Sequence, residues 1–106
     1  RDLTKVMMAN HFGDHDIYPD CREEFVNNMS AAISAGTYAH ITIDAPYTNI
    51  SKADIARKGK SLGIDYKETW SCYKGGHVHC GKCATCIERK AALAEAGIVD
   101  TTEYGA

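Results

Sequence analysis

Four cysteines within fifteen positions constrain this chain more than any other feature of its sequence. They are Cys72, Cys80, Cys83 and Cys86, in the pattern C-x7-C-x2-C-x2-C. A fifth, Cys21, makes the total odd, and in a reducing compartment clustered cysteines are more often metal ligands than disulfides. A two-residue gap lets both sulfurs of a C-x-x-C turn face one ion, and Zn²⁺ binds thiolates at about 2.3 Å. The spacing therefore predicts a metal site built from these four residues.

The sequence leaves three interpretations of that site open. A structural zinc site is favoured, because four thiolates leave no open coordination position for catalysis. An iron-sulfur cluster is the rival, since C-x-x-C-x-x-C also occurs in ferredoxin-like runs, and a catalytic or redox role of the thiols is the third. His77 and His79 could replace a cysteine, but we expect them to face solvent or to hydrogen-bond to the site. A four-thiolate zinc site carries a net charge of about −2. Basic residues near it in sequence could offset that charge: Lys74, Lys82, Arg89 and Lys90.

The bulk properties narrow the class of protein. With 106 residues, 44% of them apolar and 25% charged, the chain is the size of one domain or part of one. Its net charge of −2 gives no general attraction for polyanions, so we expect no direct nucleic-acid partner. No apolar run approaches the roughly 18 residues of a membrane span, and no signal peptide is recognisable. We therefore expect a cytoplasmic protein, and the first residue, Arg1, predicts missing sequence upstream.

Alternating strand and helix signals predict the first half of the fold. A short apolar run at 5–9 suggests a buried strand, and alternation within 38–47 suggests a second one. Between them we expect a helix capped by Asp20, with Glu23 completing a capping box. Gly36 is the expected left-handed residue that ends this helix.

The second half continues the alternation. A helix with Ile55 and Leu62 on one face is expected to end at Gly63. The stretch 65–70 is expected to be extended, and a final helix follows the cysteines and ends at Gly97. Strands and helices that alternate in this way favour an α/β fold with a parallel sheet.

Several segments together resemble a known family. They are "YPDCREEF" at 18–25, "TWSCYKGGHVHCGKCATCIERK" at 69–90 and the following "AGIVDTTEY". In this order they are similar to the C-terminal half of QueC, the 7-cyano-7-deazaguanine synthase family. The resemblance implies part of a parallel-sheet, Rossmann-like adenine nucleotide alpha hydrolase (PP-loop ATPase) fold with a C-terminal structural zinc site. Residues 1–106 would then be the C-terminal portion of a single domain, with 70–90 as its zinc-binding segment and the N-terminal nucleotide-binding half absent.

The activity that the resemblance implies is an ATP-dependent ligation. Enzymes of this family convert 7-carboxy-7-deazaguanine and ammonia to the nitrile in two passes through an adenylated intermediate. The implied cofactors are Zn²⁺ on the four cysteines and ATP with Mg²⁺, and the implied assembly is a homodimer. The chain departs from the family because it has no "SGGxDS" loop, which elsewhere grips the nucleotide. Smaller departures are Glu23 and Thr101, where the family commonly has proline, and His77, where it often has glutamate.

The segment around "YPDCR" contains the candidate substrate contacts. Arg22 could pair with an anionic group, Asp20 could accept hydrogen bonds from guanine-like N–H donors, and Tyr18 could stack. The alternative roles are structural: a surface charge, a helix cap and a packing residue. We expect Cys21 to be a buried, inert thiol, and the sequence identifies no catalytic residue.

Two other functions remain possible at this point. One is a zinc-stabilised binding module that recognises nucleic acid through its basic residues, Arg57, Lys58, Lys60, Lys82, Arg89 and Lys90. The interleaved aromatic residues of a stacking surface are missing from that set. The other is a QueC-like enzyme that couples an activated deazapurine acid to an amine other than ammonia, since function follows the site rather than the scaffold. Trp70 is interpreted as a core or lid aromatic.

Overall fold

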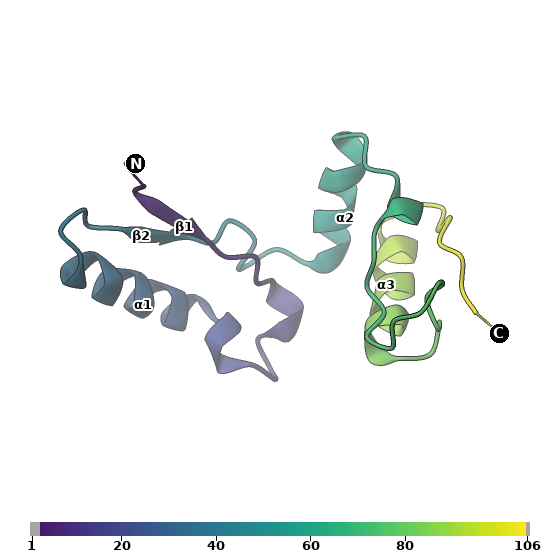
Figure 1. Cartoon of the computed structure of the whole chain (residues 1–106), viewed down its shortest axis with the longest axis horizontal. Coiled ribbons are helices and arrows are strands. Elements are labelled where there is room, and N and C mark those ends of the chain that lie inside the picture. The colour runs from purple at the N-terminus through teal and green to yellow at the C-terminus, as the bar shows by residue number, and fades with distance from the viewer. Residues whose placement is uncertain (1–2, 106) are drawn as a thin grey trace. The chain divides into compact units, whose positions relative to one another are not determined.

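The computed structural model describes residues 3–105, which form two compact units that divide after Lys52 (Figure 1). Each unit is described by itself. Among the residues that the structure describes, no helix combines the length and the apolar character that crossing a membrane requires.

The first unit is a β-α-β arrangement. Strand β1 (Lys5–Met7) pairs in parallel with β2 (Thr42–Asp44), with Val6 opposite Ile43. Helix α1 (Glu23–Gly36) connects them and lies along one side of the strand pair (Figure 1). The Ser30 hydroxyl of α1 accepts a hydrogen bond from the Ile43 amide, 2.9 Å away. The expected parallel α/β arrangement is confirmed, although each strand is only three residues long.

Both ends of α1 differ from the prediction. Asp20 does not cap the helix, because Pro19–Cys21 forms a 3₁₀ helix and α1 begins only after Arg22. Arg22 occupies the N-cap position without a side-chain cap bond. At the other end, Gly36 remains helical and Thr37 takes over the termination. The Thr37 hydroxyl donates to the Ile33 carbonyl at 3.0 Å and accepts from the Ile41 amide at 2.9 Å.

The second unit contains two helices joined by the cysteine segment. Helix α2 spans Lys52–Ser61 and α3 spans Ala84–Glu95. Gly63 and Gly97 adopt φ of 84° and 73°, so both expected left-handed stops are confirmed.

Two expectations for this unit are wrong. Leu62 is 71% exposed, and the buried side of α2 consists of small residues that include Ala56 and Gly59. Tyr66 packs against that side and donates its hydroxyl to the Ala56 carbonyl at 2.7 Å. The expected extended stretch contains a 3₁₀ helix, Tyr66–Glu68, because the Asp65 side chain accepts from the Lys67 amide and caps a turn.

The core of the second unit is formed partly by the cysteines themselves. Cys72 and Cys86 are buried, as are Ala92 and Leu93 of α3, and Cys86 is the largest fully buried side chain among the described residues. Sulfur thus occupies positions that large aliphatic side chains usually fill. Metal binding at such a core would contribute directly to folding.

Candidate functional site

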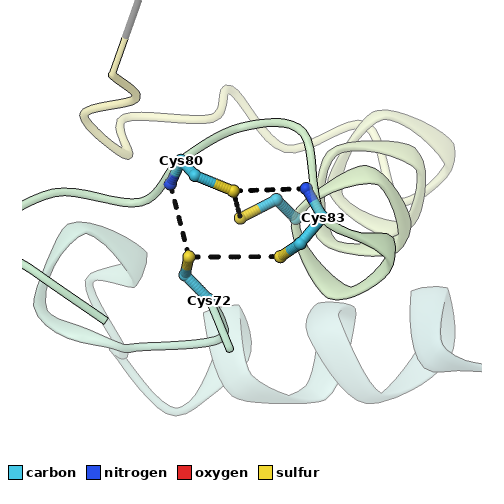
Figure 2. Close-up of side chains that lie close together, drawn as sticks. Cys72, Cys80 and Cys83 are labelled. Atoms are coloured by element: carbon cyan, nitrogen blue, oxygen red, sulfur yellow. Dashed lines mark hydrogen bonds between the residues drawn. The ribbon is translucent and has the colours of Figure 1, made fainter. Parts of the chain in front are cut away.

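The four sulfur atoms converge on one point. All Sγ atoms of Cys72, Cys80, Cys83 and Cys86 lie within 4.8 Å of one another, and Figure 2 shows the labelled side chains turned toward each other. Cys80 and Cys86 are 4.0 Å apart, as are Cys72 and Cys83. A tetrahedron with metal-sulfur bonds of about 2.3 Å has edges of about 3.8 Å, whereas a disulfide needs about 2.05 Å. The thiols are free, and their arrangement fits one tetrahedral ion.

Three segments of the second unit bring these sulfurs together. Cys72 follows the Tyr66–Glu68 turn, Cys80 and Cys83 belong to the loop before α3, and Cys86 lies in the first turn of α3. Backbone amides of Lys82 and Cys83 donate to the Cys80 sulfur at 3.3 and 3.2 Å. Gly81 permits this turn because its φ is 75°. The loop thus aims N–H groups at a sulfur in the manner that stabilises a metal-bound thiolate.

The surroundings of Cys72, Cys83 and Cys86 shift the pKa values of their thiols. The Thr85 hydroxyl, 3.1 Å from the Cys83 sulfur, is the main cause that lowers the pKa of Cys83 to about 5, together with backbone N–H groups. The Cys80 amide lowers the pKa of Cys72. Burial raises the pKa of Cys86 to about 11. A cation at the centre would favour the thiolate at every position, so the chemistry of this donor set is the binding of a soft divalent ion.

The two histidines near the cysteines lie differently. His77 is exposed, and His79 is buried. The Nε2 atom of His79 accepts a hydrogen bond from the Ser71 amide at 3.0 Å, and burial lowers the pKa of His79, so its ring is neutral with the proton on Nδ1. The Trp70 ring lies against this ring, with centroids 4.2 Å apart and planes tilted by 35°. Trp70 remains 50% exposed, so it is not a core residue.

The predicted substrate residues lie on one exposed turn of the first unit. Tyr18, Asp20 and Arg22 all belong to or flank the 3₁₀ helix Pro19–Cys21 and face solvent. The Nε atom of Arg22 donates to the His15 carbonyl at 2.7 Å. That bond fixes the base of the guanidinium group, and the described residues provide no partner for its terminal nitrogens.

A buried asparagine fastens this turn to the ends of the strands. Asn10 donates its amide to the Cys21 carbonyl at 2.7 Å and to the Thr48 hydroxyl at 3.2 Å. The Nε2–H of His15 donates to the Thr48 carbonyl at 2.7 Å. Asn10 follows β1 and Thr48 follows β2, so the turn lies at the carboxyl edge of the parallel strands. This edge is where open α/β sheets bind ligands.

Sequence reasoning missed Asn10, Thr48 and the linking role of His15. Their position directly after two predicted strands was the available signal, because carboxyl ends of parallel strands share one edge. The bond between Asn10 and Thr48 spans 38 residues, and local patterns do not encode such a pairing.

A hollow of about 220 Å³ opens at the same edge. Its polar lining includes Glu23 and Asn27 from α1 and Thr48 and Asn49 from the turn after β2. Asn49 donates to the Glu23 carboxylate at 3.0 Å. The volume is below the roughly 300–1,000 Å³ of sites for drug-sized ligands, so the hollow suits a small group.

Cys21 is half-buried rather than buried. Burial raises its pKa, and the negative charges of Asp20 and Asp14 add to the shift. The thiol form therefore prevails at neutral pH, in line with the inert role expected from the sequence.

With this geometry established, comparison with known proteins identifies the family. Residues 1–97 match the family model described as queuosine biosynthesis protein QueC. The chain belongs to the QueC family. Similar relatives of this QueC chain include the 7-cyano-7-deazaguanine synthase of Porphyromonas gingivalis, with 62% identity over 98% of the chain and 47% of that protein. The synthases of Methanoregula boonei and Caldicellulosiruptor bescii are 52% and 48% identical over 93% and 94% of the chain.

The comparison also sets the extent of the match. The chain spans about half the length of the curated relatives it matches, 47%, 46% and 45% for the three named.

Proposed function

We propose that this chain is the zinc-bearing C-terminal portion of a 7-cyano-7-deazaguanine synthase. Such an enzyme is an ATP-dependent ligase that converts 7-carboxy-7-deazaguanine and ammonia to the nitrile. The observation that carries the proposal is the 62% identity to the Porphyromonas gingivalis synthase across 98% of the chain. The match covers nearly the whole chain, so it includes both the 18–22 turn and the cysteine cluster.

The reaction requires activation twice. A carboxylate oxygen is a poor leaving group, so the carboxylate first attacks ATP, releases pyrophosphate and becomes an acyl adenylate. Ammonia then displaces AMP and yields the amide. The amide oxygen is adenylated in turn, and loss of AMP with two protons leaves the nitrile. Each nitrile therefore consumes two ATP.

The fold proposal is that residues 1–106 form the C-terminal portion of one adenine nucleotide alpha hydrolase domain. The parallel β1-α1-β2 arrangement supports it, because this fold is built on a parallel sheet. Val6 and Met7 of β1 are exposed here, whereas parallel sheets are normally covered on both faces. We propose that the N-terminal half of the full-length protein completes the sheet and supplies the loop that binds ATP with Mg²⁺.

We further propose that the 18–22 turn binds the deazaguanine substrate. Arg22 would pair with the anionic carboxylate or with the adenylate formed from it, Asp20 would accept from the N–H groups of the guanine-like ring, and Tyr18 would stack on it. The position of the turn at the carboxyl edge of the strands supports this role, since Asn10 holds it there.

The four cysteines are proposed to hold one Zn²⁺ with a structural role. Four thiolates saturate a tetrahedral ion, which then has no position for a reacting group. A cytoplasmic location is consistent with this site, because a reducing compartment keeps the thiols from pairing. The assembly is proposed to be a homodimer, as the family resemblance implies.

The test uses the full-length protein that contains this chain. We expect zinc at one equivalent per chain and nitrile formation from 7-carboxy-7-deazaguanine, ammonium and ATP, with two AMP released per nitrile. Product mass separates the alternatives: a substituted amide formed with another amine, and no nitrile, would favour the related coupling enzyme. Absence of any ATP-dependent product from zinc-replete protein would refute a ligase.

Matched arginine variants test the substrate turn. Arg22→Ala should weaken binding of the carboxylated deazaguanine and leave zinc content unchanged. Arg57→Ala is the control, because Arg57 is also an exposed arginine and bonds within the second unit to Asp54 and the Glu95 carbonyl. If both variants and the wild type bound the carboxylated deazaguanine with equal affinity, Arg22 would not be a substrate contact.

A further inference from the structure

Helix α3 contains a buried guanidinium group whose hydrogen-bond partners among the described residues are all neutral. Arg89 is 7% exposed. Its Nε donates to the Thr102 hydroxyl at 3.0 Å, and one terminal nitrogen donates to the Ser71 hydroxyl at 2.9 Å. The other terminal nitrogen reaches the Tyr66 carbonyl at 2.5 Å and the hydroxyls of Thr69 and Thr102 at 2.9 and 2.8 Å. One side chain thereby joins residues 66–71, which precede the metal loop (72–83), to helix α3 and to the segment that follows α3.

A buried cation without a contacting anion is costly, so its charge must be balanced nearby. Cys86 precedes Arg89 by three residues on α3, which puts both on one face at a rise of about 4.5 Å. Both side chains are buried. The Asp100 carboxylate supplies part of that balance, since the charge of Arg89 is one of the causes that lower the pKa of Asp100. Four thiolates around a divalent ion carry a net charge of about −2, so the occupied site adds further negative charge.

The segment after α3 also contacts the metal loop directly. Tyr104 forms a parallel bridge with His79, the neighbour of Cys80, and the Gly105 amide donates to the His79 carbonyl at 2.7 Å. The Tyr104 ring meets the His79 ring edge-on at 5.9 Å, and the Lys90 ammonium lies 4.4 Å from the centre of the Tyr104 ring. Residues 98–105 therefore contact the metal loop through Tyr104 and contact Arg89 through Thr102.

We propose that Arg89 is a positioning residue that couples metal occupancy to the order of residues 98–105. The metal-thiolate charge stabilises the buried guanidinium, and the guanidinium fixes Thr102 and, with it, the backbone that pairs with His79. Removal of the ion frees the loop that carries Ser71 and His79, which loosens its contacts with Arg89 and with Tyr104 and so releases the segment. The inference depends on the zinc centre proposed above but not on the ligase activity.

The experiment compares three variants in zinc-loaded full-length protein. Arg89→Gln removes the charge and the fork of donors, Arg89→Lys keeps only the charge, and Arg57→Gln is the matched control on α2. Amide hydrogen exchange is followed at Thr102 and Gly105, together with the rate of zinc transfer to a chromophoric chelator. We expect Arg89→Gln to accelerate exchange at both amides by about tenfold or more and to release zinc faster, because bonds to a charged donor are lost. Arg89→Lys should lie between, and Arg57→Gln should match the wild type.

The outcomes decide the proposal in each case. Exchange at Thr102 and Gly105 within twofold of the wild type in Arg89→Gln, with zinc retained, would overturn it. If Arg89→Gln does not fold, stepwise chelation of the wild type decides instead, with amides of α1 as the internal reference. Exchange at the two amides must then rise as zinc leaves, and unchanged exchange overturns the coupling. A wild type that binds no zinc overturns both the metal centre and the coupling, whereas an inactive ligase with a zinc-dependent segment overturns only the proposed function.

Discussion

Replacing Gly59 by alanine should destabilise helix α2, although the same change in a helix usually stabilises. Alanine is favoured over glycine in a helix interior by about 1 kcal/mol. At Gly59, however, an added Cβ would lie 2.2 Å from the Tyr66 hydroxyl oxygen. That hydroxyl must move and lose its 2.7 Å bond to the Ala56 carbonyl. Overpacking costs about 1–3 kcal/mol, and so does leaving the buried partner unsatisfied. These costs together are about 2–6 kcal/mol, and the gain of about 1 kcal/mol in helix propensity offsets part of them, so we expect the free energy of unfolding to fall by about 1–5 kcal/mol.

Gly36 supplies the matched control. It is the last residue of α1, its backbone is right-handed, and a Cβ there would meet nothing within 4 Å. Gly36→Ala should thus raise the stability of α1 by about 0.5–1 kcal/mol. A second control is Gly59→Ala on a Tyr66→Phe background, where the clashing oxygen is absent and the loss should shrink.

The measurement is native-state hydrogen exchange, which gives an opening free energy for each helix separately. This separation matters because the chain forms two units. The reasoning would be refuted if Gly59→Ala stabilised α2 by as much as Gly36→Ala stabilises α1. That result would also show that Tyr66, whose carbonyl accepts a hydrogen bond from the Arg89 guanidinium, is not held rigidly against α2.

Three further predictions concern the site. Asn10→Ala should cost about 2–3 kcal/mol in the unfolding free energy of the first unit, because one buried and one partly buried hydrogen bond are lost, whereas Asn49→Ala at an exposed bond should stay within about 0.5 kcal/mol. Equal effects in denaturant titrations would contradict the anchoring role. Cys72→Ser should lower the zinc content measured by elemental analysis well below one per chain, and full retention would show that the sulfur is not a ligand. Burial and the bond to Asp100 raise the pKa of Tyr104 above its usual value near 10, so the contribution of Tyr104 to stability is complete below that pH and is lost as pH rises through the folded pKa. A tyrosinate absorbance titration of wild type minus Tyr104→Phe should show this late midpoint, Asp100→Asn should lower it, and a midpoint at or below 10 would contradict it.

The features that the sequence predicted correctly are those encoded by near neighbours. The close C-x-x-C spacings indicated which sulfurs would converge, and the structure brings all four within 4.8 Å. Gly63 and Gly97 ended their helices as expected, because a left-handed residue is a local requirement. The parallel pairing of β1 with β2 followed from the strand-helix-strand order.

The errors arose where a neighbouring segment decided between local options. Asp20 has a side chain that commonly caps helices, but it lies inside the 3₁₀ helix Pro19–Cys21, so the N-cap position of α1 falls to Arg22. Leu62 had the period of a core residue, yet Tyr66 packs on the small residues of α2 and leaves Leu62 exposed. The anchoring of the 18–22 turn by Asn10 depends on contacts with segments distant in sequence, which single-sequence patterns do not specify.

The position of Trp70 gives the protein a built-in optical probe. It is the single tryptophan of the chain, its indole N–H donates to the Cys72 carbonyl at 2.7 Å, and its ring rests on His79. Its half-exposed ring will change emission wavelength and intensity if this loop loosens. Intrinsic fluorescence can therefore follow the loading and loss of the ion in unlabelled protein, with the six tyrosines distinguished by selective excitation at longer wavelength.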